Sequence, residues 1–167
     1  MTKSLRDRLI GAWDLIEYCA YLPDDEDDKV YPMGPDAKGI IMYTPDGYMS
    51  AQLLTPGQPK FDTAKGSEAE WARAGKNYVA YTGPFYLDEE GDDAGPLLLH
   101  HMRTSSLPYL VGDTQRRLVA IRDEPDGTYL VLSLKGTMKV AGQDRLIRVR
   151  WRRLPDNQAT APPNASR

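Results

Sequence analysis

Short strand-like segments separated by turns recur along this 167-residue chain. About eight to ten such segments follow one another, with turn sequences such as Pro45-Asp46-Gly47 and Glu124-Pro125-Asp126-Gly127 between them. This spacing is typical of a closed antiparallel barrel and differs from the strand and helix alternation of a doubly wound sheet. The sequence therefore predicts an all-β fold, with one barrel domain over residues 1–154 and a disordered tail over residues 155–167.

The first and last segments predict how the barrel closes. Gly11-Ala12-Trp13 opens the first strand, and Leu5 and Leu9 stand at helical spacing just before it, so a short helix should cover the same end. Because the first and last strands of a barrel pair, Arg153 is expected to lie over the indole of Trp13. The inward face of the last strand then carries Ile147, Val149, Trp151 and Arg153, and the outward face carries Arg148, Arg150 and Arg152.

Residues 39–53 form the clearest hairpin signal. Pro45 suits a type I turn and Gly47 can adopt the left-handed conformation, which places Tyr43 opposite Met49. Both faces of this hairpin are partly apolar, and we favour the Tyr43 face as the inner one. That face carries Ile41, Tyr43, Met49, Ala51 and Leu53, and the other carries Ile40, Met42, Tyr48, Ser50 and Gln52.

Two segments between the strands have distinct signatures. The run of acids at 24–28 is typical of an exposed loop, followed by a short strand at 29–31. Ser67 and Glu70 form a capping box, which predicts a helix from about 67 to 78. The apolar stripe of this helix, which includes Trp71, would pack on the barrel rim or outer wall, or the helix would serve as a lid over the open end.

Composition limits the partners and the compartment. The formal net charge of -3 argues against a nucleic-acid-binding surface. Cys19 is the single cysteine, so no intramolecular disulfide can form, which fits a reducing compartment. No apolar run approaches the roughly 18 residues that span a bilayer. We therefore expect a cytoplasmic protein that contacts neither nucleic acid nor membrane.

The first strand offers a carboxylate to the interior. If Trp13 points inward, the period of two carries Leu15, Glu17, Cys19 and Tyr21 inward with it. A carboxylate inside a barrel must be paired, hydrogen-bonded or protonated. Glu17 is therefore either the polar end of a ligand pocket or the salt-bridge partner of an internal arginine.

Both histidines of the chain are adjacent, so one points into the barrel and the other points out. They cannot both bind one metal ion as same-face neighbours, and we expect no zinc site. His100 shares its face with Leu98 and Met102, whereas His101 shares its face with Arg103. The apolar face favours His100 as the inner residue, although a polar pocket would reverse the order.

An ordered series of motifs runs through almost the whole chain up to Leu154. It consists of Gly11-Ala12-Trp13, Gly39, Tyr43 to Ser50, Tyr81-Thr82-Gly83, His100-His101, Pro108, Gly112, Gln115, Arg117, Trp151 and Arg153. This series resembles the lipocalin-like domain family of bacterial and fungal proteins, although Leu107 and Tyr109 depart from its pattern around Pro108. The resemblance implies an eight-to-ten-stranded barrel with a central cavity and a link to natural-product biosynthesis. It does not imply one reaction.

Two functions remain open on this basis. A binding or carrier protein would hold one small apolar molecule in the barrel. A cofactor-free cyclase, isomerase or dehydratase would add proton transfer by an internal side chain, without metal or cofactor. The catalytic candidates are His100, His101, Glu17, Tyr43 and Arg117. The candidate ligand contacts are Leu15, Cys19, Tyr21, Ile41, Met49, Ala51, Tyr86, Met102 and Arg103. Exposed strand edges could also pair two barrels as a homodimer.

Overall fold

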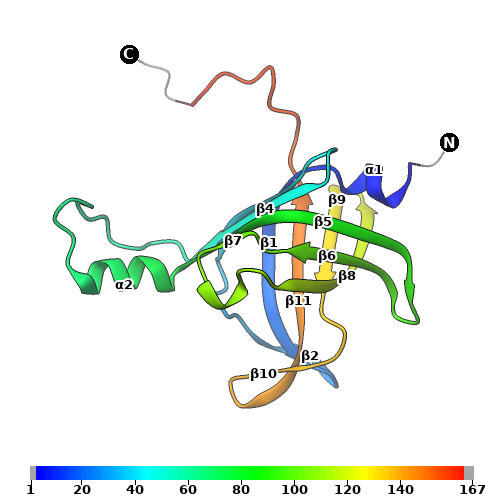
Figure 1. Cartoon of the computed structure of the whole chain (residues 1–167). Coiled ribbons are helices and arrows are strands. Elements are labelled where there is room, and N and C mark those ends of the chain that lie inside the picture. Colours follow the sequence, from blue (N-terminus) through cyan, green and yellow to red (C-terminus); the bar gives the residue numbers. More distant parts are fainter. Residues whose placement is uncertain (1–2, 164–167) are drawn as a thin grey trace.

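Eight antiparallel strands close into a barrel in the computed structural model, which describes residues 3–163 (Figure 1). Around the barrel the order is β1-β3-β4-β5-β6-β8-β9-β11, and pairing of β11 with β1 completes the ring. The all-β barrel predicted from the sequence is confirmed. The elements are α1 (Leu5–Leu9), β1 (Gly11–Leu22), β2 (Asp25–Val30), β3 (Lys38–Tyr43), β4 (Tyr48–Leu54), α2 (Glu68–Lys76), β5 (Tyr78–Asp92), β6 (Gly95–His101), β7 (Thr104–Ser105), η1 (Pro108–Leu110), β8 (Thr114–Glu124), β9 (Gly127–Ser133), β10 (Met138–Val140) and β11 (Gln143–Arg153).

One end of the barrel is closed as the sequence predicts. Trp13 is fully buried, and its indole N–H donates a 2.9 Å hydrogen bond to the carbonyl of Leu9 at the end of α1. Trp13 also pairs with Arg153 across the β1–β11 seam, and the guanidinium carbon lies 3.9 Å from the centre of the indole ring. Arg153 further donates to the carbonyls of Ile10 and Arg8. The contact therefore ties the last strand to the helix that covers this end.

A β-bulge at Ile16 reverses the alternation along β1. Leu15 pairs with Trp151, whereas Glu17 pairs with Arg150, so Ile16 is an extra residue in β1. Trp13 and Leu15 face the interior before the bulge, and Tyr18 and Ala20 face it afterwards, opposite Val149 and Ile147. The expectation that Glu17, Cys19 and Tyr21 point inward is wrong, because it carried an unbroken period of two through the bulge.

The β3–β4 hairpin has the predicted register. Tyr43 pairs with Met49 and Ile41 with Ala51, while Gly47 has a φ of 96° in the connecting turn. Ile41, Tyr43, Met49 and Ala51 are all buried, whereas their neighbours on the opposite face are half-buried or exposed. The choice of the Tyr43 face as the inner one is confirmed.

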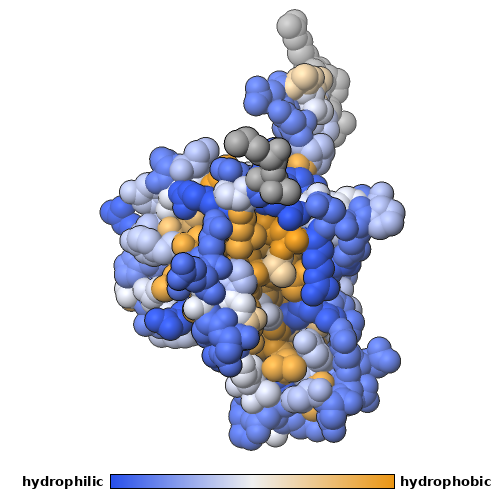
Figure 2. All heavy atoms as spheres, turned by 90° about the vertical axis from the view of Figure 1, so that its right-hand side faces the viewer, coloured by the Kyte–Doolittle hydropathy of each residue, from blue (hydrophilic) through white to orange (hydrophobic). Residues whose placement is uncertain are grey.

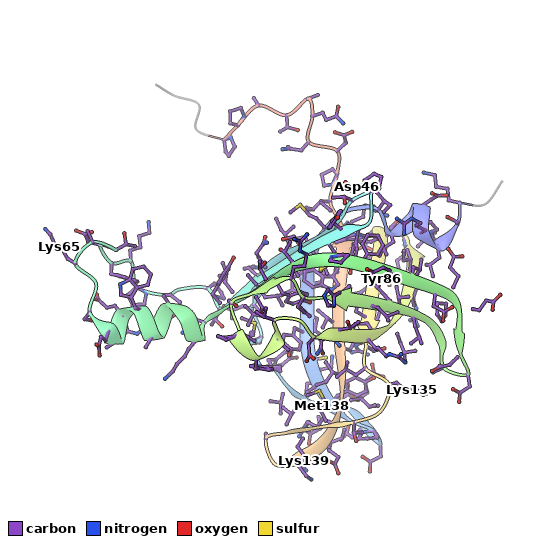
Figure 3. All side chains as sticks on the ribbon, viewed as in Figure 1. Asp46, Lys65, Tyr86, Lys135, Met138 and Lys139 are labelled. Carbon is purple, nitrogen blue, oxygen red and sulfur yellow. The ribbon has the colours of Figure 1, made fainter. Side chains whose placement is uncertain are left out.

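The helix α2 projects away from the barrel (Figure 1). Ser67 and Glu70 form the predicted capping box, but no residue of α2 is buried. Trp71 instead packs edge-to-face on Phe61, with ring centres 5.2 Å apart, and Lys65 marks the tip of the projecting segment (Figure 3). Neither expected role for this helix, wall packing or lid, is found. The indole of Trp71 packs on the loop that precedes the helix.

The acidic run forms a strand, not the predicted loop. β2 begins at Asp25 and pairs with the end of β1. Arg145, which is only 3% exposed, holds this segment beside the barrel. It forms a 2.9 Å ion pair with Asp28 and donates a 2.7 Å hydrogen bond to the Asp28 carbonyl. These contacts anchor the acidic hairpin to β11.

Beyond the barrel, residues 155–163 are exposed and carry only a short turn. The disorder expected over residues 155–167 stays a prediction, and residues 164–167 lie outside the described part of the chain, as do residues 1–2. The face that looks to the right in Figure 1 carries an apolar strip bordered by hydrophilic residues (Figure 2). Within residues 3–163 no helix is long and apolar enough to cross a membrane.

Candidate functional site

Large side chains fill the inside of the barrel beside α1. Trp13, Tyr43 and Trp151 are each at most 2% exposed. Tyr18 and Val149, which lie further along β1 and β11 from α1, are only partly buried although they face inward. Further along the same strands Ala20 and Ile147 are buried again, so the partial burial is local to Tyr18 and Val149.

A tyrosine–histidine pair forms the polar centre of this interior. The hydroxyl of Tyr43 on β3 lies 2.9 Å from Nε2 of His100 on β6, and both residues are buried. Phe85 packs edge-to-face on Tyr43 with ring centres 5.1 Å apart, and the Tyr81 ring centre lies 6.1 Å from that of His100. Two aromatic rings of β5 therefore lie beside the Tyr43–His100 pair.

The second ring nitrogen of His100 has no hydrogen-bond partner within residues 3–163, although it is fully buried. Burial, followed by the positive charge of Arg117, lowers the pKa of His100 to about 3, so the imidazole is neutral at physiological pH. Burial also raises the pKa of Tyr43 well above 10, so its hydroxyl stays protonated. One of the two nitrogens of His100 therefore pairs with Tyr43, and the other, which is shielded from solvent, has no partner among these residues.

Three more polar side chains reach the same interior. Tyr18 and Tyr81 face inward from β1 and β5, and burial raises the pKa of both hydroxyls. Arg117 on β8 lies directly opposite the fully buried Leu98, which places it on the inner face. Its guanidinium donates to the side-chain oxygen of Gln115 at 3.4 Å and to the carbonyl of Arg116 at 3.0 Å.

Glu17 belongs to a separate network on the outer face. Its carboxylate forms ion pairs with Lys29 at 3.0 Å and Arg148 at 3.2 Å, and it accepts a bond from the thiol of Cys19. Burial alone would raise the pKa of Glu17, but these bonds outweigh it and hold the pKa below 4.5. Burial and the bond to Glu17 raise the pKa of Cys19 to about 11, so the thiol is unreactive at neutral pH.

The structure divides the predicted site residues into two groups. His101 lies on the outer face of β6, where its Nδ1 is 3.0 Å from the hydroxyl of Thr114. Tyr86 is 58% exposed on the outside of β5 (Figure 3), and Arg103 is exposed beyond the end of β6. The inner group consists of His100, Tyr43, Arg117, Leu15, Ile41, Met49, Ala51 and Met102, and the outer group consists of His101, Glu17, Cys19, Tyr21, Tyr86 and Arg103.

Sequence reasoning missed two inward tyrosines. Tyr18 was hidden by the bulge at Ile16, which no pattern in the sequence announces. Tyr81 could have been found, because it pairs with Ala51 of the recognised hairpin and so shares its inner face. Because the helix was expected to extend to residue 78, the start of β5 at Tyr78 and its pairing with β4 were not recognised.

His100 should make stability depend on pH. The unfolded chain takes up a proton at His100 below about pH 6.5, whereas the folded protein takes it up only near pH 3. The unfolding free energy should therefore fall as pH is lowered from 6.5, by at most about 1.4 kcal/mol per pH unit from this group. Urea titrations between pH 7 and 4 measure this slope. The unfolding free energy of His100→Gln should depend less on pH, whereas that of His101→Gln should keep the wild-type slope. Equal slopes in the two variants would refute the assignment of this pH dependence to His100.

Comparison with known proteins agrees with this architecture. A model of the lipocalin-like domain matches residues 10–154. A 4'-hydroxy-3'-methoxypropiophenone carrier protein of Aspergillus oryzae is 31% identical over 112 residues, which cover 64% of this chain and 97% of the relative. The family model covers every strand of the barrel, including β1 and β11, whose pairing closes it, and this chain belongs to the lipocalin-like domain family.

Proposed function

We propose that this protein is a non-catalytic carrier of a small aromatic molecule that bears a hydroxyl or carbonyl oxygen. The observation that carries the proposal is the buried ring nitrogen of His100 that has no partner within residues 3–163. A buried polar atom without a partner costs about 1–3 kcal/mol, and a guest oxygen in hydrogen-bond reach would recover it. The aromatic rings of Tyr43, Tyr81 and Phe85 provide the apolar surroundings that such a guest needs.

The state of His100 favours binding over catalysis. A general base works best when its pKa lies near the operating pH. His100, with a pKa lowered to about 3 by burial and by Arg117, is a poor proton acceptor at neutral pH. Glu17, the carboxylate considered for the same role, lies on the outer face and is held by two cations. A neutral imidazole is nevertheless a good hydrogen-bond partner, which is what a carrier requires.

The Aspergillus relative guides the choice of ligand. Its name assigns it 4'-hydroxy-3'-methoxypropiophenone, an aryl ketone with a phenolic hydroxyl. We propose a ligand of this chemical class for the present chain, carried in the cytoplasm. We also propose a homodimer. The pairing of β1 with β11 closes the barrel, and β2 and β10 are the ends of the sheet order, where an exposed edge could pair with a second copy.

Titration calorimetry with 4'-hydroxy-3'-methoxypropiophenone tests the carrier function. We expect saturable binding at one site and recovery of the ketone unchanged after incubation. His100→Leu should weaken binding about tenfold, the equivalent of one lost hydrogen bond. Glu17→Gln is the matched control on the outer face and should bind as the wild type does. Conversion of the ketone into a new product by the wild type, lost in His100→Leu, would overturn the carrier proposal in favour of an enzyme.

A further inference from the structure

Arg117 is a cation on the inner face of the barrel without an ion-pair partner among residues 3–163. It faces inward opposite Leu98, and its guanidinium donates only to neutral oxygens, the Gln115 side chain and the Arg116 carbonyl. No carboxylate of these residues lies within 4.0 Å of it. A charge held partly out of water is normally paired with an opposite charge.

The other inward arginines are already committed. Arg145 pairs with Asp28 at 2.9 Å, and Arg153 lies over Trp13 and donates to two backbone carbonyls. Asp123, which shares the inward alternation of β8, lies next to α1 and pairs with Arg8 at 2.9 Å. Arg117 is therefore the inward cation whose charge is left for a guest molecule.

The remaining titratable groups of the interior are neutral hydrogen-bonding groups. Tyr18 faces inward from β1, Tyr43 from β3, Tyr81 from β5 and His100 from β6. Arg117 pairs with Leu98 and His100 pairs with Gln115, so Arg117 and His100 lie two residues apart on the inner face of the β6–β8 pair. The buried ring nitrogen of His100 that has no partner among the described residues is a second, independent polar group on this inner face.

We infer that the barrel binds its ligand as an anion, a phenolate whose charged oxygen lies beside the Arg117 guanidinium and within reach of His100. This inference rests on the proposed carrier function and narrows its ligand class to acidic phenols. The phenolic O–H bond of the ligand breaks on binding and the proton passes to bulk water, so no protein base is required. An opposite charge within about 4–6 Å shifts an acid by one to three pKa units, a tenfold to thousandfold increase in acidity.

The ionisation of 4'-hydroxy-3'-methoxypropiophenone provides a direct optical test, because the phenolate of an acylphenol absorbs at longer wavelength than the phenol. The spectrum of the bound ketone is recorded from pH 5 to 9 and compared with that of the free ketone. We expect the phenolate band to appear at least one pH unit lower in the bound ketone. Arg117→Gln should abolish this shift, and Arg116→Gln, which changes the outward neighbour, should preserve it.

The methyl ether of the same ketone, 3',4'-dimethoxypropiophenone, separates the two proposals because it cannot ionise. Binding of both ketones without a phenolate band, or an unchanged band in Arg117→Gln, would overturn the anion inference and leave the carrier function standing. Failure of both ketones to bind the wild type would overturn the carrier function for this ligand class, and the anion inference with it. A shift in the wild type that is lost only in Arg117→Gln supports both.

Discussion

Trp13→Ala lowers the unfolding free energy by about 3–5 kcal/mol, the usual cost of truncating a buried tryptophan. The indole is fully buried, bonds to the carbonyl of Leu9 and lies under Arg153. Truncation therefore opens a cavity at the point where the first strand, the last strand and α1 meet. Urea denaturation followed by far-ultraviolet circular dichroism measures the loss without depending on tryptophan fluorescence.

The chain contains a matched control for this variant. Trp71 is 49% exposed on the projecting helix and contacts Phe61 edge-to-face. Trp71→Ala should cost less than about 1 kcal/mol, because it removes one aromatic pair at the surface. Equal losses in the two variants would mean that closure of the barrel end does not depend on Trp13.

The closed end was predictable because its signals are local or lie at the two ends of the barrel sequence. Gly11-Ala12-Trp13, the alternation of the last strand and the turn at Gly47 each specify a contact or a register that the structure contains. The prediction needed one long-range assumption, which is that the first and last strands of a barrel pair, as β1 and β11 do. These features required no knowledge of how the side chains pack.

The site was only half predictable, because one extra residue changes which side chains share a face. The bulge at Ile16 removed Glu17 from the interior and replaced it with Tyr18. The apolar neighbours of the two adjacent histidines correctly predicted which one points inward, because His100 shares its face with Leu98 and is buried. Among residues 3–163 one nitrogen of His100 has no hydrogen-bond partner and Arg117 has no ion-pair partner, and both facts depend on the surrounding side chains, which alternation alone cannot reveal.

The second large effect is expected at Gly83, where β5 changes its pairing partner. Phe85 pairs with His100 of β6, whereas Tyr81 pairs with Ser105 of β7, so the chain between β6 and β7 crosses close to Gly83. A Cβ at Gly83 would overlap the carbonyl oxygen of His101 and lie 2.9 Å from the amide nitrogen of Arg103. Both are backbone atoms, so neither can be relieved by a side-chain rotation.

Gly83→Ala should therefore lower the unfolding free energy by about 3 kcal/mol, at the upper end of the usual cost of overpacking. The displaced carbonyl belongs to the residue next to His100, so the 2.9 Å contact between His100 and Tyr43 should also lengthen and ligand affinity should fall. Gly75→Ala is the control: nothing lies within 4 Å of its added Cβ on α2, and alanine favours a helix by up to about 1 kcal/mol. Urea denaturation and calorimetry with the acylphenol, run on both variants, measure the two effects. A Gly83→Ala protein of wild-type stability that binds normally would show that β5 and the crossing chain are not held at this spacing, and that the position of His100 is set elsewhere.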